Sequence, residues 1–257
     1  MITSINNPSV KNIVALQSKS KARKEQGVFL VEGPKMVSEI PEGLLKELYV
    51  SEEFKADGQY KELLKNKKYE LVSGKVFREI SDTQTPQGIL AVVCQQNYTL
   101  DMILRKKDIH LLLLEDIQDP GNLGTMLRTG EGAGVTGVIM SKGCVDLYNP
   151  KVIRSTMGAI YRVPFLYTED FYGVITKIKE ICKVYAAHLK AKQYYDKSNY
   201  KAPTAILIGN ESRGLKEETA ALADILIKIP MLGKVESLNA AVAAALLMYE
   251  VYRQRRN

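Results

Sequence analysis

The stretch from residue 226 to 249, LIKIPMLGKVESLNAAVAAALLMY, places the strongest constraint on the fold of this chain. The apolar run at 225–229 predicts a strand, and the proline after it ends that strand because proline lacks the N–H that a central strand donates. After a loop, residues 240–248 predict a helix without a polar face, which is expected inside a core. Its first turn presents N–H groups, with Ser237 and Asn239 as candidate caps. The stretch therefore predicts either a plain capped helix or one wall of a ligand pocket.

The second half of the chain predicts a doubly wound α/β domain. Its first strand, 110–114, reads HLLLL, and such an unbroken apolar run is typical of a parallel strand covered on both faces. Further strands are predicted at residues 136–140, around Phe165, and at 184–187, 205–208 and 225–229. Helices are predicted between them at residues 123–133, 149–160 and 172–181. In such sheets ligands bind at the carboxyl ends of the strands.

The first half alternates strands and helices on a smaller scale, which favours a small α/β sandwich. Its predicted strands are residues 28–31, 45–50, 69–72 and 88–93. Its predicted helices are residues 9–24, a short segment after Gly33, and residues 59–67 and 75–80. A change of composition at 95–108 separates the two halves. We therefore predict two domains, residues 1–97 and 98–257.

The charge of the chain favours a polyanionic partner. The 257 residues carry a formal net charge of +7, and the segment from Lys11 to Lys24 contains five basic residues and no acid. A solvated basic surface is the simpler explanation of the same charges. The absence of tryptophan and the presence of only five phenylalanines argue against a broad stacking platform for single-stranded nucleic acid.

Several classes of protein are disfavoured by the composition. The N-terminal MITSINNPSV lacks the basic and apolar regions of a signal peptide. The longest apolar run, 240–249, is about half of the ~20 residues that a membrane span needs. The three cysteines and two histidines lack metal-ligand spacing. We expect a cytoplasmic protein with no membrane association and no metal.

Three loops rich in glycine and polar side chains follow predicted buried strands, at 115–124, 209–214 and 229–239. The first has glycines spaced G-x-x-G, whereas a dinucleotide loop needs G-x-G-x-x-G and a P-loop ends in Gly-Lys-Ser/Thr. This spacing excludes nicotinamide binding and ATP hydrolysis. In the second loop, Gly209 would let a ligand approach the backbone, although a plain strand-to-helix turn also explains it. Together the three loops predict one shared pocket.

The motifs in these loops resemble those of the SpoU/TrmH family, RNA 2′-O-ribose methyltransferases of the SPOUT superfamily. The motifs are Asn122 with Arg128 six residues later, GNESRGL at 209–215, and IPM followed by SLNAAVAAA at 229–245. Two further segments resemble the family, KARKEQGVFLVEGPKMV at 21–37 in its N-terminal substrate-binding domain and NPKVIRSTMGAIYRVPF at 149–165 in members acting on ribosomal RNA. One departure is Ala240-Ala241, where many members have Val-Ser.

The resemblance implies a C-terminal α/β-knot domain, with a deep trefoil knot and a mostly parallel sheet, and a small N-terminal α/β substrate-binding domain. It also implies S-adenosylmethionine as the methyl donor, RNA as the substrate, with ribosomal RNA expected, and a homodimer formed through the C-terminal domain. The implied cofactor-binding residues are Gly209, Asn210, Ile229, Met231, Ser237 and Leu238. The implied catalytic residues are Asn122, Arg128, Glu211, Ser237 and Asn239.

Two of these residues have more than one possible role. The family's favoured general base is the arginine at position 128, but a guanidinium stays protonated in proteins. Arg128 could instead bind a substrate phosphate bidentately. Glu211 could orient Arg128, act as the base if burial raises its pKa, or hold backbone N–H groups in a purely structural role.

RNA contact is expected from basic residues of the N-terminal segment and from two beside the pocket: Lys19, Lys21, Arg23, Lys24, Lys142 and Arg154. A non-catalytic RNA-binding protein that keeps the fold is the alternative function, and transfer RNA is the alternative substrate. The enzyme is favoured by the joint presence of Asn122, Arg128, Glu211, Ser237 and Asn239, because a protein that only binds RNA has no reason to retain them together.

Overall fold

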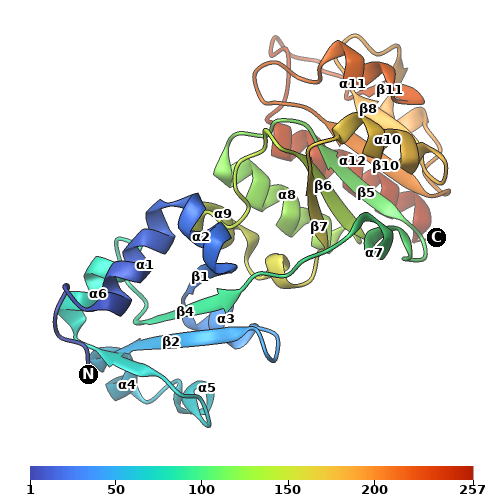
Figure 1. The fold of residues 1–257 in the computed structure, drawn as a ribbon. Helices are drawn as coiled ribbons and strands as arrows, with labels where there is room; N and C mark the ends of the chain where they lie inside the picture. The colour runs from blue at the N-terminus through green and yellow to red at the C-terminus, as the bar shows by residue number, and fades with distance from the viewer. Residues whose placement is uncertain (257) are drawn as a thin grey trace. The chain divides into compact units, whose positions relative to one another are not determined.

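The computed structural model describes residues 1–256, and the chain divides into two compact units (Figure 1). The first unit comprises residues 1–96 and 146–161. The second comprises residues 97–145 and the chain from 162 onward. The predicted division into 1–97 and 98–257 differs from these units in one respect: the segment 146–161 belongs to the first unit.

The first unit is built on a four-stranded sheet with the order β1-β4-β2-β3. Strand β4 runs antiparallel to both of its neighbours, whereas β3 runs parallel to β2. The strands are β1 (Val28–Glu32), β2 (Leu45–Ser51), β3 (Glu70–Val72) and β4 (Ile89–Cys94). The helices are α1 (Pro8–Ser18), α2 (Ser20–Gln26), α3 (Pro34–Ser38), α4 (Glu52–Asp57), α5 (Lys61–Leu64), α6 (Gly74–Ile80) and α9 (Pro150–Thr156), followed by a 3₁₀ turn at Ala159–Tyr161.

Two helices of this unit differ from the prediction. The helix expected at 9–24 is interrupted at Lys19, whose extended backbone separates α1 from α2. Helix α4 was not predicted, although Ser51 caps it by accepting the N–H of Phe54 and two glutamates occupy its first turn. The core of the unit forms where α1 and α6 pack against the sheet through Ile13, Leu16 and Phe77.

Arg23 makes one of the contacts that join the segment 146–161 to the rest of this unit. Its side chain is 3% exposed, and its guanidinium pairs with the Asp146 carboxylate at 2.7 Å. The same guanidinium donates to the carbonyl oxygens of Leu16 and Gln17, at the end of α1, over 2.6 and 3.1 Å. The expectation that Arg23 contacts RNA is therefore wrong, because its side chain is buried and its guanidinium is already bonded to these three protein groups.

The second unit contains a seven-stranded sheet in which every pair of neighbouring strands is parallel. Its order is β7-β6-β5-β10-β8-β11-β9. The strands are β5 (His110–Leu114), β6 (Gly137–Ser141), β7 (Phe165–Thr168), β8 (Lys183–Ala187), β9 (Gln193–Tyr194), β10 (Thr204–Ile208) and β11 (Ile225–Lys228). The helices are α7 (Leu100–Leu104), α8 (Pro120–Gly132), α10 (Phe171–Lys179), α11 (Glu217–Ala221) and α12 (Ala240–Arg255), with a 3₁₀ turn at Tyr195–Lys197.

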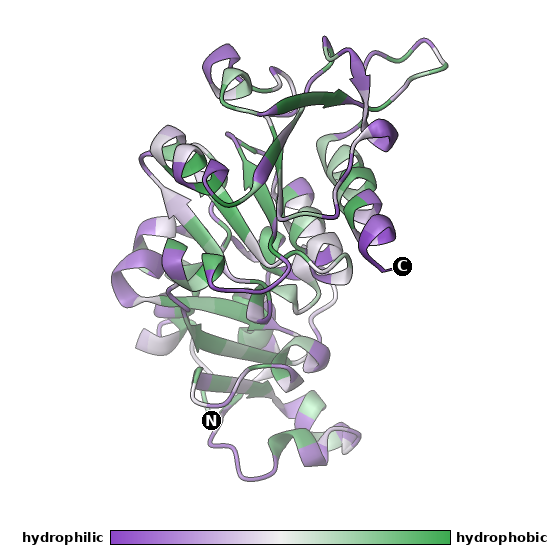
Figure 2. Ribbon diagram, turned by 90° about the vertical axis from the view of Figure 1, so that its right-hand side faces the viewer, coloured by the Kyte–Doolittle hydropathy of each residue, from purple (hydrophilic) through white to green (hydrophobic). Residues whose placement is uncertain are grey.

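This sheet confirms the doubly wound α/β prediction, and only the two-residue β9 was not anticipated. Hydrophobic residues are concentrated in the strands, whereas the loops and helix ends are hydrophilic (Figure 2). Strands β5, β6 and β10 are buried along their whole length, as the run of leucines predicted. The trefoil knot implied by the resemblance stays a prediction. No helix within residues 1–256 combines the length and the apolar character needed to cross a bilayer.

Helix α12 is less buried than its sequence predicted. One side packs on α8 and β10 and buries Ala244 and Leu247. The other side exposes Val242, Leu246 and Tyr249, which are 49%, 39% and 47% accessible. Both sides of the helix are apolar, but only one of them is buried. Its apolar composition therefore does not mean that the helix is enclosed in a core.

The Arg23→Met variant is expected to lose about 2 kcal/mol of unfolding free energy, because it removes charge-assisted hydrogen bonds and leaves Asp146 without its partner. Urea denaturation measures the change. The matched control is Lys24→Met, whose side chain is exposed on the same helix and whose loss should cost less than about 0.5 kcal/mol. Equal stability of Arg23→Met and the wild type would show that the buried pair does not hold the segment 146–161.

Candidate active site

Two of the predicted loops meet at the carboxyl ends of neighbouring strands. Because β5 and β10 are adjacent and parallel, the segments that follow them, 115–122 and 209–216, lie together. The Glu211 carboxylate joins them. It accepts the backbone N–H of Gln118 at 3.2 Å, the backbone N–H of Asp119 at 3.0 Å and the side-chain amide of Asn122 at 3.1 Å.

Asn239 brings the third loop to the same place. Its side-chain amide donates to the side-chain oxygen (Oδ1) of Asn122 at 2.9 Å, and its own Oδ1 caps α12 by accepting the N–H of Ala241 at 2.9 Å. The prediction of Asn239 as a helix cap is confirmed. A continuous chain of hydrogen bonds therefore runs from Glu211 through Asn122 to Asn239; we call it the Glu211–Asn122–Asn239 relay.

The hydrogen bonds of Glu211 decide its ionisation. Burial by itself would raise the pKa of the Glu211 carboxyl, but the donors on Asn122, Asp119 and Gln118 outweigh burial and lower the pKa. The carboxylate is therefore ionised at neutral pH, and the Asn210 side-chain amide is a fourth, longer donor to it at 3.5 Å. A general base with a raised pKa, one of the roles considered from the sequence, does not fit this environment.

A pocket of about 340 Å³ opens beside the relay, at the carboxyl ends of β10, β8 and β11. Glu211 belongs to its wall as well as to the relay. Helix α12 contributes Ala240, Ala243 and Leu247 from one of its faces. All six residues expected to bind a cofactor line this pocket: Gly209, Asn210, Ile229, Met231, Ser237 and Leu238.

A fourth segment of the pocket wall, residues 187–190, was not predicted from the sequence. This segment follows β8, which lies in the sheet between β10 and β11. His188 is held there by its backbone N–H, which donates to the Ile227 carbonyl oxygen at 2.9 Å. The available signal was the predicted strand 184–187 followed at once by a histidine, since the carboxyl end of every parallel strand reaches the same edge of the sheet.

Gly209 is required for a different reason from the one expected. A Cβ at this position would collide with the backbone of Gly214 and Leu215. The close approach is therefore made by the loop's own backbone, and the loop is closed there by paired hydrogen bonds between Asn210 and Gly214 of 3.1 and 2.9 Å. A larger residue at 209 would displace the loop.

Arg128 lies apart from the pocket of its own chain. It is exposed on α8 and does not line the pocket, and its guanidinium makes no hydrogen bond or ion pair within residues 1–256. Ser237 is exposed at the pocket wall. Of the five residues expected to be catalytic, the relay unites Asn122, Glu211 and Asn239.

Comparison with known protein families shows to which family this chain belongs. The model of the SpoU rRNA methylase family matches residues 110–249, more than half of the chain. The chain belongs to this family. The model of the MRM3-like substrate binding domain matches residues 7–91.

Three individual relatives of the family are similar over nearly the whole chain. The 23S rRNA (guanosine(2553)-2′-O)-methyltransferase RlmP of Bacillus subtilis is 33% identical, over 97% of this chain and 98% of its own length. The SpoU methyltransferase AviRb from Streptomyces viridochromogenes, solved in complex with AdoMet, has a TM-score of 0.89 at 27% identity and covers 98% of this chain and 99% of its own. An AdoMet-bound rRNA methyltransferase from Sinorhizobium meliloti has a TM-score of 0.85 at 32% identity, over 98% and 97% of the two chains.

The basic residues expected to contact RNA differ in their exposure and in their ion pairing. Lys19, Lys21 and Lys24 are exposed on the first unit. In the second unit Lys142 pairs with Glu169 at 2.8 Å, and both side chains are about three-quarters exposed. Arg154 pairs with Asp82 within the first unit. An exposed ion pair is weak and can exchange its acid for a phosphate.

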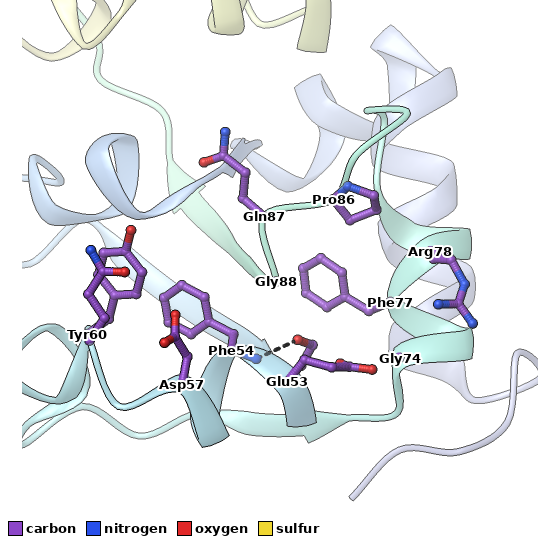
Figure 3. A pocket seen from close by; sticks show the side chains of 12 residues that line it. Glu53, Phe54, Asp57, Tyr60, Gly74, Phe77, Arg78, Pro86, Gln87 and Gly88 are labelled. Atoms are coloured by element: carbon purple, nitrogen blue, oxygen red, sulfur yellow. Dashed lines mark hydrogen bonds between the residues drawn. The ribbon is translucent and has the colours of Figure 1, made fainter.

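The substrate-binding unit has a pocket of its own, of about 410 Å³, between α4, α6 and the turn at 86–88 (Figure 3). Phe54 and Tyr60 stack there with ring centroids 4.7 Å apart. Its wall carries the acids Glu53 and Asp57 and a single arginine, Arg78. The excess of carboxylates disfavours a phosphate group in this pocket.

The Glu211→Gln variant tests the ionised state of the relay. The pKa of Glu211 is lower in the folded protein than in the unfolded chain. The charged carboxylate therefore stabilises the fold at pH values above about 4, the ordinary pKa of a glutamate. This stabilisation is lost as the pH falls through the pKa of the folded state. We expect the variant to be about 1–3 kcal/mol less stable at pH ~7 and the gap to shrink below pH ~4. Urea denaturation at both pH values measures it, with the exposed Glu218→Gln as control. A gap that stays constant with pH would contradict the assignment.

Proposed function

We propose that this chain transfers the methyl group of S-adenosylmethionine to a ribose 2′-hydroxyl of ribosomal RNA. The observation that carries the proposal is the Glu211–Asn122–Asn239 relay beside the 340 Å³ pocket. The name of the RlmP relative specifies a 2′-O-methyltransferase of 23S rRNA, and two solved relatives carry AdoMet. A protein that only binds RNA would not need three polar side chains bonded to one another at a cofactor-sized pocket.

The pocket suits the proposed cofactor in size and in chemistry. Its volume lies within the range of roughly 300–1,000 Å³ that small-molecule sites occupy. Ile208, Ile227 and Leu247 provide apolar contact for a purine ring, and the small side chains of Ala240 and Ala243 leave it room. Bound S-adenosylmethionine would supply an electrophilic methyl group. Gly209, Ile229 and Leu238 would hold the cofactor, with Met231 and Ser237 beside it.

The residues of the chain are proposed to act chiefly by positioning the ribose, because methyl transfer needs its hydroxyl in line with the methyl group. Glu211 orients the Asn122 amide, and Asn239 fixes the other end of that amide. Arg128 is proposed to bind a substrate phosphate, a role for which its permanent charge and forked donors are suited. The exposed lysines 19, 21 and 24 would add phosphate contacts whose strength falls with salt.

A homodimer through the C-terminal unit is part of the proposal. The exposed apolar residues of α12, Val242, Leu246 and Tyr249, form one stripe, which is unusual on a surface left to water. The Tyr249 hydroxyl lies against Gly132 of α8, one helical turn beyond Arg128. A partner that covers this stripe would lie next to Arg128, so Arg128 would serve the pocket of the partner subunit.

The Ala243→Leu variant should lose S-adenosylmethionine binding, because the added carbons enter the pocket from the face of α12 that lines it. We expect the affinity in isothermal titration calorimetry to fall by at least tenfold, or about 1.4 kcal/mol. The control, Ala221→Leu, makes the same change at an exposed position outside the pocket and should bind as the wild type does. Unchanged affinity of Ala243→Leu would mean that the cofactor does not occupy this pocket.

The Arg128→Ala variant should keep cofactor affinity and lose turnover by roughly 100-fold, since misplacing the ribose has a cost of that order. The assay follows methyl transfer from labelled S-adenosylmethionine to unmethylated 23S rRNA, with unmethylated transfer RNA in parallel.

Mixing Arg128→Ala with Ala243→Leu subunits should restore part of the activity, because a mixed dimer combines one open pocket with the arginine of the other subunit. No recovery would refute action across the dimer, and cofactor binding without transfer to either RNA would favour the RNA-binding alternative.

A further inference from the structure

Two acidic residues at the end of β5 face a lysine from the loop that follows β10. The Lys216 ammonium lies 2.9 Å from an Asp116 carboxylate oxygen and 3.8 Å from a Glu115 carboxylate oxygen. None of the three lines the pocket or belongs to the relay. They nevertheless connect the two segments, 115–122 and 209–216, that the relay also joins.

The two carboxylates are held on several sides. Glu115 is 2% exposed and accepts the backbone N–H of Lys216 at 2.9 Å and the hydroxyl of Thr219. Asp116 accepts the Ser141 hydroxyl at 2.8 Å, while its own N–H donates to the same oxygen at 2.9 Å. Both acids therefore have hydrogen-bond partners other than the Lys216 ammonium.

The backbone of Asp116 is strained in a way that points to a specific role. Its φ of 54° lies in the left-handed region, which residues other than glycine rarely adopt. In this conformation its carbonyl oxygen accepts the side-chain amide of Asn210 at 2.8 Å. Gly143 packs so tightly against the Asp116 carboxylate that a Cβ there would overlap it. Such strain persists only where the surroundings over-determine the conformation, and it concentrates at functional sites.

The loop 209–216 has its own internal closure, so these contacts do not form the turn. The hydrogen bonds between Asn210 and Gly214 hold the turn as a unit. Other contacts must therefore fix the position of this turn relative to the segment 115–122. Lys216 and Asn210 both reach Asp116, one at each side of Glu211 in the sequence.

We propose that Lys216 and Asp116 are positioning residues for methyl transfer, which hold the turn so that Glu211 stays against Asn122. The proposal rests on the proposed function and adds residues that act through Glu211 without touching the cofactor or the substrate. Lys216 is half exposed, and pairs of that kind contribute little to stability. Loss of the pair should therefore appear in the rate of transfer rather than in the melting temperature.

Two variants remove the pair while respecting the local backbone. Lys216→Met keeps the length of the side chain and deletes its charge. Asp116→Asn deletes the opposite charge and tolerates the left-handed conformation, which asparagine adopts readily. Lys216→Arg keeps the cation and serves as the rescue. Lys179→Met is the matched control, because Lys179 also pairs with an aspartate, Asp224, at 3.2 Å in the same unit and lies away from the pocket.

The experiment measures single-turnover methyl transfer to unmethylated 23S rRNA, S-adenosylmethionine affinity by calorimetry, and hydrogen exchange of the Gln118 and Asp119 amides. We expect Lys216→Met and Asp116→Asn each to slow transfer by roughly tenfold to 100-fold, with cofactor affinity changed less than threefold and the melting temperature nearly unchanged. The two amides, which donate to Glu211, should exchange faster. Lys216→Arg should recover most of the rate, and Lys179→Met should match the wild type.

The exchange measurement separates the two proposals. If the wild type transfers no methyl group to the RNA, the proposed function fails, while unaltered amide exchange in Lys216→Met would still overturn the positioning role. If the wild type is active, wild-type rates in both variants overturn the positioning role and leave the function intact. A uniform loss of rate, affinity and melting temperature would show that the pair is only structural and would also overturn it.

Discussion

The Glu211 carboxylate is the interaction on which the rest of the site depends. Asn122 lies 89 positions away from it in the chain, and only the parallel pairing of β5 with β10 brings the two segments together. A carboxylate bound by two backbone N–H groups and one side-chain amide fixes both segments at once. Asn122 then transmits that order to Asn239 and so to the first turn of α12, which forms part of the pocket wall.

Placing the site at a strand end has a simple electrostatic reason. The turn between a strand and the next helix exposes N–H groups that need acceptors, and Glu211 supplies them from a neighbouring loop. Because these donors lower the pKa of the carboxyl, Glu211 is a weaker base than an ordinary glutamate and serves as a fixed negative charge. In the proposed reaction, proton removal from the ribose would fall to groups outside the relay, and the relay would contribute by holding the geometry of the site.

Much of the second unit could be predicted, since its strands are buried on both faces and read as continuous apolar runs. The site followed from the same pattern together with the family motifs: Glu211 follows the end of β10, and Asn239 caps the start of α12. What could not be predicted depends on contacts distant in sequence. Arg23 looks like its exposed neighbour Lys24 until Asp146 is placed beside it. His188 enters the pocket because of the strand order, and Gly209 is explained only by the backbone that packs on it. The burial of helix α12 was not predicted correctly, because composition alone cannot distinguish a helix enclosed in a core from one with an exposed apolar face.

The passage of residues 146–161 through the first unit has a consequence for how this protein can be dissected. The polypeptide crosses between the units three times, so the N-terminal part is not an appendage that a single cut would release. A fragment that starts at residue 97 would retain Val152 and Ile153, apolar side chains of α9, while lacking β1, the strand that covers them. Grafting the substrate-binding unit onto another methyltransferase would likewise mean transplanting two stretches of chain together.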